Sequence, residues 1–199
     1  MQQPFPVLTH LYLSSPESEN GITITLPDNF LGGSAPRLWR FTLRGIPFPG
    51  LPKLLLSTRD LVFLYLDNIP IGGYISPDLM VNQCLSSLPY LALLNILFQS
   101  PTPTPTRPRP PSSIRIVLPA LGKFLFRGTS EYFEDLIARI DAPQLIDLRT
   151  TFFNQLIFQV PQLSQFISRT EKLDYFNKAD VSFDGSTRKV SIGIHSVGL

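Results

Sequence analysis

The chain has very few of the residues that build disulfide frameworks, metal sites and common catalytic centres. Cys84 is the single cysteine among 199 residues, so no intrachain disulfide can form. The two histidines, His10 and His195, stand at opposite ends of the sequence. No P-loop, G-x-G-x-x-G, G-x-S-x-G or metal-spaced His/Cys cluster is present. We therefore expect no catalytic residues, no metal and no small-molecule cofactor. An enzyme, such as a hydrolase, is the disfavoured alternative.

Long apolar runs and a strong net charge are also missing. The most apolar run, 88–98, is far too short to span a bilayer. The first residues show neither the basic nor the apolar region of a signal peptide. The formal net charge of +2 is too small to argue for nucleic acid. Together with the single cysteine, these features predict an intracellular protein, in cytoplasm or nucleus, that is neither secreted nor bound to a membrane.

The sequence does contain a recurring apolar pattern, Pro-x-Leu-x-x-(Leu/Phe)-x-apolar. It is clear in four copies, weaker after Pro143, and lacks the proline in two further copies. The leading leucines are Leu8, Leu38, Leu61, Leu91, Leu121, Leu145 and Leu173, separated by 30, 23, 30, 30, 24 and 28 residues. A repeat of this length and composition is typical of an irregular leucine-rich repeat.

This spacing predicts an α/β fold, an irregular leucine-rich-repeat solenoid with a parallel sheet on one face and short helices and loops on the other. One unit cannot bury its apolar face alone, so neighbouring units must stack. We expect parallel strands in sequence order near 8–14, 38–44, 61–67, 91–97, 121–127 and 145–151, in one domain over 1–199. A β-sandwich is the alternative, but its strands usually recur every 8–12 residues.

Between the strands, the sequence predicts helices over 54–60, 77–88 and 129–140, and another after Pro161. It also predicts an extra strand at 22–26 and a terminal hairpin over 181–194. Cys84 lies on the apolar stripe of the second helix, where a buried small hydrophobe is favoured over a reactive thiol. Three acids of the third helix, Glu131, Glu134 and Asp135, are expected to face water rather than to form a catalytic pair.

Residues 100–113 are a proline-rich insertion that cannot pack as a repeat. A passive extended loop is favoured. The alternatives are a proline-motif ligand for a partner domain, or a switch phosphorylated at Thr102 or Thr104.

Several segments carry a resemblance to a known family. They are 30–38 (FLGGSAPRL), 72–77 (GGYISP), 130–143 (SEYFEDLIARIDAP) and 152–156 (FFNQL). With these, nearly the whole chain resembles the repeat region of fungal, mushroom-type F-box-like leucine-rich-repeat proteins. The resemblance implies a non-catalytic recognition surface and a substrate-choosing role in ubiquitin ligation. Because the chain enters directly on a repeat strand, we also expect it to be a fragment of a longer array.

The working surface is predicted from strand alternation, because side chains two, four and six residues after each leading leucine point to the free, concave face. Those expected to bind a partner are Tyr12, Arg40, Arg44, Phe63, Tyr65, Lys123, Arg127 and Arg149. Arginine beside exposed aromatic side chains favours a protein partner with an acidic segment. The alternatives are ordinary solvated strand residues, a truncated or orphan repeat protein without independent function and, least favoured, nucleic acid.

Overall fold

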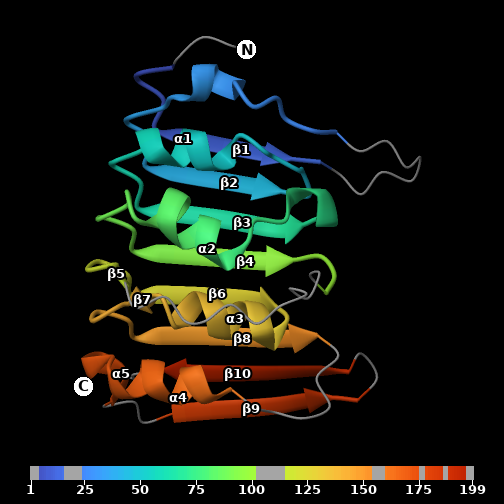
Figure 1. The fold of residues 1–199 in the computed structure, drawn as a ribbon, viewed down its shortest axis with the longest axis vertical. Helices are drawn as coiled ribbons and strands as arrows, with labels where there is room; N and C mark the ends of the chain where they lie inside the picture. The colour runs from blue at the N-terminus through green and yellow to red at the C-terminus, as the bar shows by residue number, and fades with distance from the viewer. Residues whose placement is uncertain are drawn as a thin grey trace.

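An eight-stranded sheet runs the length of the molecule (Figure 1) in the order β1-β2-β3-β4-β6-β8-β10-β9. The computed structural model describes residues 5–15, 24–101, 115–153, 160–174, 178–185 and 188–195. The strands of this sheet are β1 (His10–Ser14), β2 (Arg40–Arg44), β3 (Phe63–Ile69), β4 (Leu93–Phe98), β6 (Lys123–Gly128), β8 (Asp147–Phe153), β9 (Lys178–Asp184) and β10 (Lys189–His195). The fold is therefore mixed α/β around a mostly parallel sheet.

The first six strands of the sheet pair in parallel and in sequence order, as predicted. Each begins two residues after its leading leucine. From Leu38 to Leu145 these leucines are at most 1% exposed, whereas Leu8 is half-buried. The apolar pattern therefore marks the entry to each strand, where the leucine turns into the core.

One hydrogen-bond arrangement repeats between the entries of the six parallel strands. The carbonyl oxygen of Thr9 accepts the N–H groups of Trp39 and Arg40, at 2.8 and 3.0 Å. The corresponding carbonyl oxygens of Trp39, Val62, Ala92 and Gly122 each accept two N–H groups from the next unit in the same way. This arrangement fixes the register between neighbouring units before the strands themselves begin.

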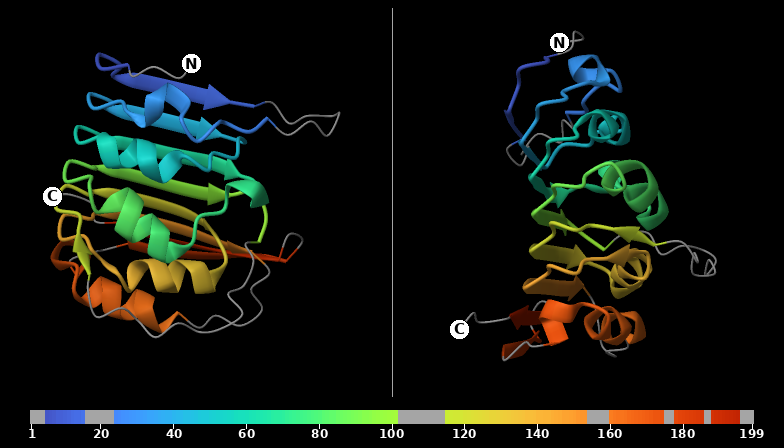
Figure 2. Two further views of the ribbon diagram at one scale, coloured as in Figure 1. Left: turned by 45° about the horizontal axis from the view of Figure 1, so that its top comes forward. Right: turned by 90° about the vertical axis from the view of Figure 1, so that its left-hand side faces the viewer.

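The helices lie on one side of the sheet (Figure 2). They are α1 (Leu51–Ser57), α2 (Pro77–Leu79), the π-helix η3 (Met80–Leu85), α3 (Ser130–Ile137), α4 (Pro161–Ser168) and α5 (Glu171–Asp174), with 3-10 turns η1 (Phe30–Gly33) and η2 (Ile71–Gly73). The core fills the space between them and the sheet. In-register strand residues such as Phe41, Leu64 and Leu94 are fully buried there.

Caps define the two helices that the sequence predicts best. The Ser76 hydroxyl accepts the N–H of Leu79 at 3.3 Å, and the Thr129 hydroxyl accepts the N–H of Tyr132 at 3.4 Å. The predicted start of the first helix is wrong. Pro52 lies inside the first turn of α1, where its missing N–H leaves no intrahelical bond unmade.

One further prediction is corrected, and the repeat pattern fails to mark a strand at its last copy. Within the expected strand 22–26, the described residues 24–26 form none, and Leu26 instead donates its N–H to the carbonyl of Pro47. Leu173, the last leading leucine, lies in α5 rather than entering a strand. The predicted terminal hairpin is confirmed, because β9 and β10 pair in antiparallel fashion. β10 also pairs with β8 and so takes the next place in the sheet.

Smaller features complete the helix side. β5 (Ile116–Val117) and β7 (Ile140–Asp141) form a separate parallel pair. Cys84 is fully buried, and this burial raises the pKa of its thiol to about 12, so the interpretation of Cys84 as a buried small hydrophobe is confirmed.

The proline-rich insertion, with Thr102 and Thr104, falls almost entirely outside the described residues. Among the described residues, no helix combines the length and apolar composition needed to cross a membrane.

Candidate protein-binding face

The candidate site is the face of the sheet opposite the helices, here called the helix-free face (Figure 2). Strand register aligns its side chains in rows across the parallel strands. The first row is His10, Arg40, Phe63, Leu93, Lys123 and Asp147, and the second is Tyr12, Thr42, Tyr65, Asn95, Leu125 and Arg149. In a third line, Ser14, Arg44 and Asp67 align across β1 to β3, and Leu97, Arg127 and Thr151 across β4 to β8.

An aromatic–arginine cluster occupies the β1–β3 end of this face; it comprises His10, Trp39, Arg40, Phe63 and Tyr65. The guanidinium carbon of Arg40 lies 5.6 Å from the ring centre of Phe63 and 4.9 Å from that of Tyr65. Arg40 also donates to the Tyr65 hydroxyl at 3.2 Å. The Trp39 ring packs against both Phe63 and His10, at 4.7 and 5.3 Å. Cation–π contacts therefore hold the Arg40 side chain along the surface.

The next polar group on this face surrounds Asp67. Its carboxylate accepts a hydrogen bond from the side-chain amide of Asn95, which is 6% exposed. Burial raises the pKa of Asp67, although the positive charges of Arg44 and Arg127 and the Asn95 bond act in the lowering direction. Arg127 donates its Nε to the carbonyl of Phe98 at 3.0 Å. The Arg127 side chain therefore helps to stabilise the end of β4.

Asp147 organises the opposite end of the helix-free face. Its carboxylate lies 2.8 Å from Lys123 Nζ, 3.0 Å from Arg149 Nε and 2.9 Å from His195 Nδ1. Burial acts to raise the pKa of Asp147, but hydrogen bonds from Lys123 and Arg149 and their charges outweigh it, so the pKa is lowered. Asp180 adds a second carboxylate, 3.9 Å from His195 Nε2. Lys123 and Arg149 therefore already share an anionic partner at this end.

All eight residues predicted for partner binding lie on the helix-free face, but they form two groups. Tyr12, Arg40, Phe63 and Tyr65 sit together on β1–β3, with Arg44 on the same strand as Arg40. Lys123, Arg127 and Arg149 lie on β6 and β8. Arg40 and Arg44 form no ion pair within the described part of the chain, whereas Lys123 and Arg149 both pair with Asp147. Among the described residues of these two groups, the guanidinium groups of Arg40, Arg44 and Arg127 therefore have no ion-pair partner, and two of the three lie on β2.

Sequence reasoning missed two residues of this face. Trp39 precedes its strand and so falls outside the two-four-six count, although it is the only tryptophan and is 40% exposed. His195 reaches the face only because β10 pairs beside β8, a partnership that no local pattern indicates.

The described residues contain no group of three or more His, Cys, Asp or Glu side chains placed to hold a metal ion. On the helix side, an apolar cavity of about 10 Å³ is lined by residues including Leu43, Phe48, Leu66, Met80 and Phe98. That volume is about the space needed for one water molecule. A metabolite would not fit there.

No family model matches the chain, and no curated protein or solved structure matches it either.

Proposed function

We propose that this chain is a non-catalytic leucine-rich-repeat module that binds a protein segment on the β1–β3 end of its helix-free face. The observation that carries the proposal is the placement of Arg40. Its guanidinium lies across Phe63 and Tyr65 without a carboxylate partner in the described residues. An arginine held in this way needs little further ordering to pair with an incoming carboxylate.

The bound segment is acidic and carries at least one apolar or aromatic side chain. Arg40 and Arg44 supply the positive charge, and Tyr12, 64% exposed, and Trp39 supply apolar surface beside it. Tyrosine, tryptophan and arginine are the residue types that dominate protein-binding hot spots. The ion pairs around Asp147 favour a structural role for the other end of the face.

The wider proposal follows the family resemblance. The repeat units stack as a solenoid, and the chain serves inside the cell as the substrate-recognising part of an F-box-like ubiquitin-ligase adaptor. The regular strand entries and the one-sided helices support the solenoid assignment. An orphan repeat protein without independent function is the competing proposal. Screening the purified chain against ester, peptide and phosphate substrates tests the non-catalytic assignment, because reproducible turnover lost on replacing one polar side chain would contradict it.

A peptide selection tests the binding proposal. Random peptides displayed on phage are selected on the wild-type chain and counted for acidic residues. We expect enriched peptides rich in Asp and Glu that bind at least tenfold more weakly to the Arg40→Ala/Arg44→Ala double variant. The matched control is Arg37→Ala/Arg59→Ala, which removes two exposed arginines outside the helix-free face. Peptides without acidic enrichment, or equal loss of binding in both double variants, would contradict the proposal.

A further inference from the structure

β9 is the last strand in the sheet order, and within the described residues it pairs only with β10. Its outer edge therefore presents backbone N–H and C=O groups that no strand in the described part of the chain uses. Such an edge is a template for pairing with another strand. All seven residues of β9, Lys178–Asp184, are exposed.

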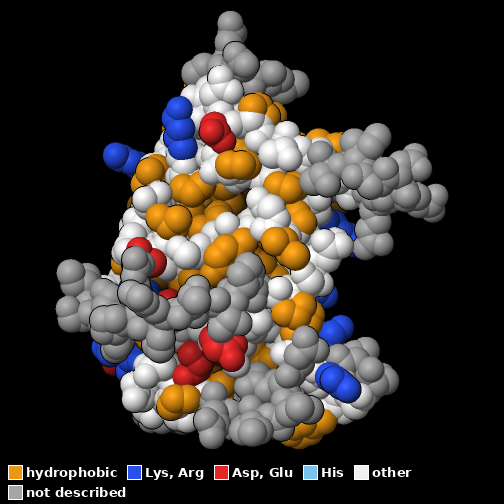
Figure 3. All heavy atoms as spheres, turned by 45° about the vertical axis from the view of Figure 1, so that its right-hand side comes forward, with side chains coloured by type: hydrophobic (Ala, Val, Ile, Leu, Met, Phe, Trp, Pro, Cys, Tyr) orange, Lys and Arg blue, Asp and Glu red, His pale blue; other side chains and the backbone are white. Residues whose placement is uncertain are grey.

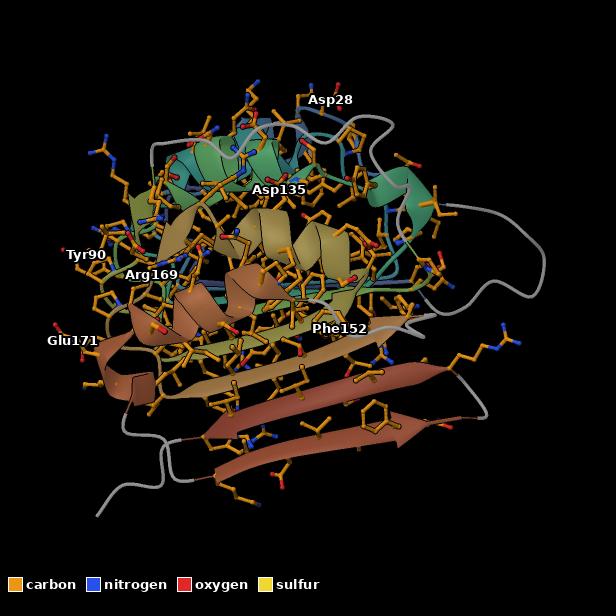
Figure 4. All side chains as sticks on the ribbon, turned by 60° about the horizontal axis from the view of Figure 1, so that its bottom comes forward. Asp28, Tyr90, Asp135, Phe152, Arg169 and Glu171 are labelled. Carbon is orange, nitrogen blue, oxygen red and sulfur yellow. The ribbon has the colours of Figure 1, made fainter. Side chains whose placement is uncertain are left out.

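The helix-side surface of β9 is apolar and uncovered. Register places Ala179, Val181 and Phe183 opposite Ile194, Ile192 and Val190 of β10, respectively, so all six side chains share one face of the sheet. The three β10 residues are 3–7% exposed, whereas Val181 is 55% and Phe183 74% exposed. Hydrophobic side chains reach the surface near the lower end of the molecule, where β9 lies (Figure 3). Viewed with that end forward, the helices stand over β6 and β8 and leave β9 bare (Figure 4).

The other face of β9 is polar, and its charges are arranged so that a reversed copy is complementary. Lys178 lies at the beginning of the strand and Asp184 at its end, with Asp180 and Ser182 between them. The Lys178 ammonium lies 3.3 Å from the Asp180 carboxylate in an exposed ion pair, which a second carboxylate can join. If a second β9 runs antiparallel with Val181 opposite Val181, each Lys178 faces Asp184 of the second copy. On the apolar side, Ala179 then faces Phe183 of the second copy. Opposite charges and apolar pairs directly across strands both stabilise a sheet.

Other registers are less favourable. Shifting the second copy by two residues in one direction places Asp180 opposite Asp184 of that copy. Shifting it by two residues in the other direction places Asp180 opposite Asp180 of that copy. Like charges directly opposite are destabilising. Shifting by one residue puts the apolar side chains of one copy beside the charged side chains of the other.

We propose that the outer edge of β9 binds β9 of a second copy of this chain, antiparallel and centred on Val181, so that the two sheets become continuous. The contact is two-fold symmetric and uses the same residues on both copies. It goes beyond the proposed peptide binding and is independent of it, because β9 and the aromatic–arginine cluster lie toward opposite ends of the sheet.

Disulfide trapping tests the register directly. In Val181→Cys, the two introduced thiols meet across the symmetry axis, and mild oxidation should yield a covalent dimer. In Phe183→Cys, a similarly exposed position, the partner residue is Ala179, so little covalent dimer should form. Cys84 is buried, so it does not interfere. Equal cross-linking of both variants, or none with Val181→Cys, would overturn the proposal.

A charge exchange tests the same contact without a covalent bond. Sedimentation equilibrium should show that the wild-type chain dimerises. The dissociation constant of the dimer should rise about tenfold in Lys178→Asp and in Asp184→Lys, since each change creates two like-charge contacts per dimer. The double exchange Lys178→Asp/Asp184→Lys should recover most of that loss. A wild-type chain that stays monomeric, or an exchange that recovers nothing, would contradict the proposed pairing.

Discussion

Asp147 shows how a single carboxylate connects three neighbouring strands. It lies on β8 and accepts from Lys123 on β6 and contacts His195 on β10. The contact with β10 matters most, because this is where the sheet changes from parallel to antiparallel pairing. We therefore expect Asp147 to contribute to stability rather than to binding.

Replacing Asp147 by Asn should lower the free energy of unfolding by about 1–2 kcal/mol at neutral pH, because the charge-assisted hydrogen bonds are weakened. The pKa of Asp147 is lowered from 3.8 in the folded chain. Its contribution is therefore complete above about pH 4 and is lost as the pH falls through the lowered folded pKa. Urea unfolding of both proteins across this range measures the effect. Asp60→Asn, at an exposed site, is the control, and a difference that stays constant down to pH 2 would contradict this account.

The Cys84 thiol should be unreactive in the folded chain. Burial raises its pKa to about 12, so almost no thiolate is present at pH 8. A thiol reagent should modify Cys84 only as fast as the chain unfolds, and rapidly in denaturant. Stoichiometric labelling of the native chain within minutes would be inconsistent with this burial.

At the level of elements, the parallel strands were predictable because their signal is local. Each leading leucine turns into the core two residues before its strand, and alternation then assigns the faces. The fate of Leu173 was not predictable in this way. Its local pattern resembles the other copies, but α5 forms there and β10 occupies the next position in the sheet. A strand partner chosen by long-range packing leaves no signal in a short window of sequence.

Two neighbouring leucines of β4 provide a test of face assignment. Leu94 is fully buried, so Leu94→Ala should cost about 2–5 kcal/mol. Leu93 is half-buried on the helix-free face, so Leu93→Ala should lower the free energy of unfolding by less than about 1 kcal/mol. Equal losses in chemical denaturation would show that the faces are assigned wrongly.

Glu134 on α3 is a cap for a different helix. Its carboxylate accepts the N–H groups of Gln162 and Leu163 in the first turn of α4, at 2.7 and 3.0 Å. The prediction that Glu134 faces water is therefore wrong. The prediction for Asp135 is wrong as well, because its carboxylate pairs with the buried Arg139, at 2.8 Å. The Glu134 contact depends on tertiary placement, whereas Asp135 and Arg139 are only four residues apart in the sequence. Of the three acids, only Glu131 is exposed as expected.

Removing this cap should loosen α4. Glu134→Ala should lower the free energy of unfolding by about 1 kcal/mol, with faster amide hydrogen exchange in the first turn of α4. Glu134→Gln keeps an acceptor oxygen, so it should lower the free energy of unfolding by less than Glu134→Ala does. Glu131→Ala should leave both readouts near wild type. If the two alanine variants behave alike, Glu134 is not a cap.

For the molecule as a whole, alternation predicted which side chains share the helix-free face, but not how its charge is distributed. Five cations on that face were expected to act together. Asp147 pairs with two of them, and Arg127 is bonded to the Phe98 carbonyl. Such pairing depends on distances that only the folded sheet fixes. Of these five cations, Arg40 and Arg44 are therefore the two that bond to neither a carboxylate nor a backbone carbonyl among the described residues.

The most direct test of the account is the affinity of a selected acidic peptide for single variants, measured by titration calorimetry. Arg40→Ala should weaken binding at least tenfold, because it removes the cation held across Phe63 and Tyr65. Arg149→Ala, at the opposite end of the same face, should change the affinity less than about twofold. Equal losses in the two variants, or a larger loss with Arg149→Ala, would contradict the placement of the binding site on the β1–β3 end.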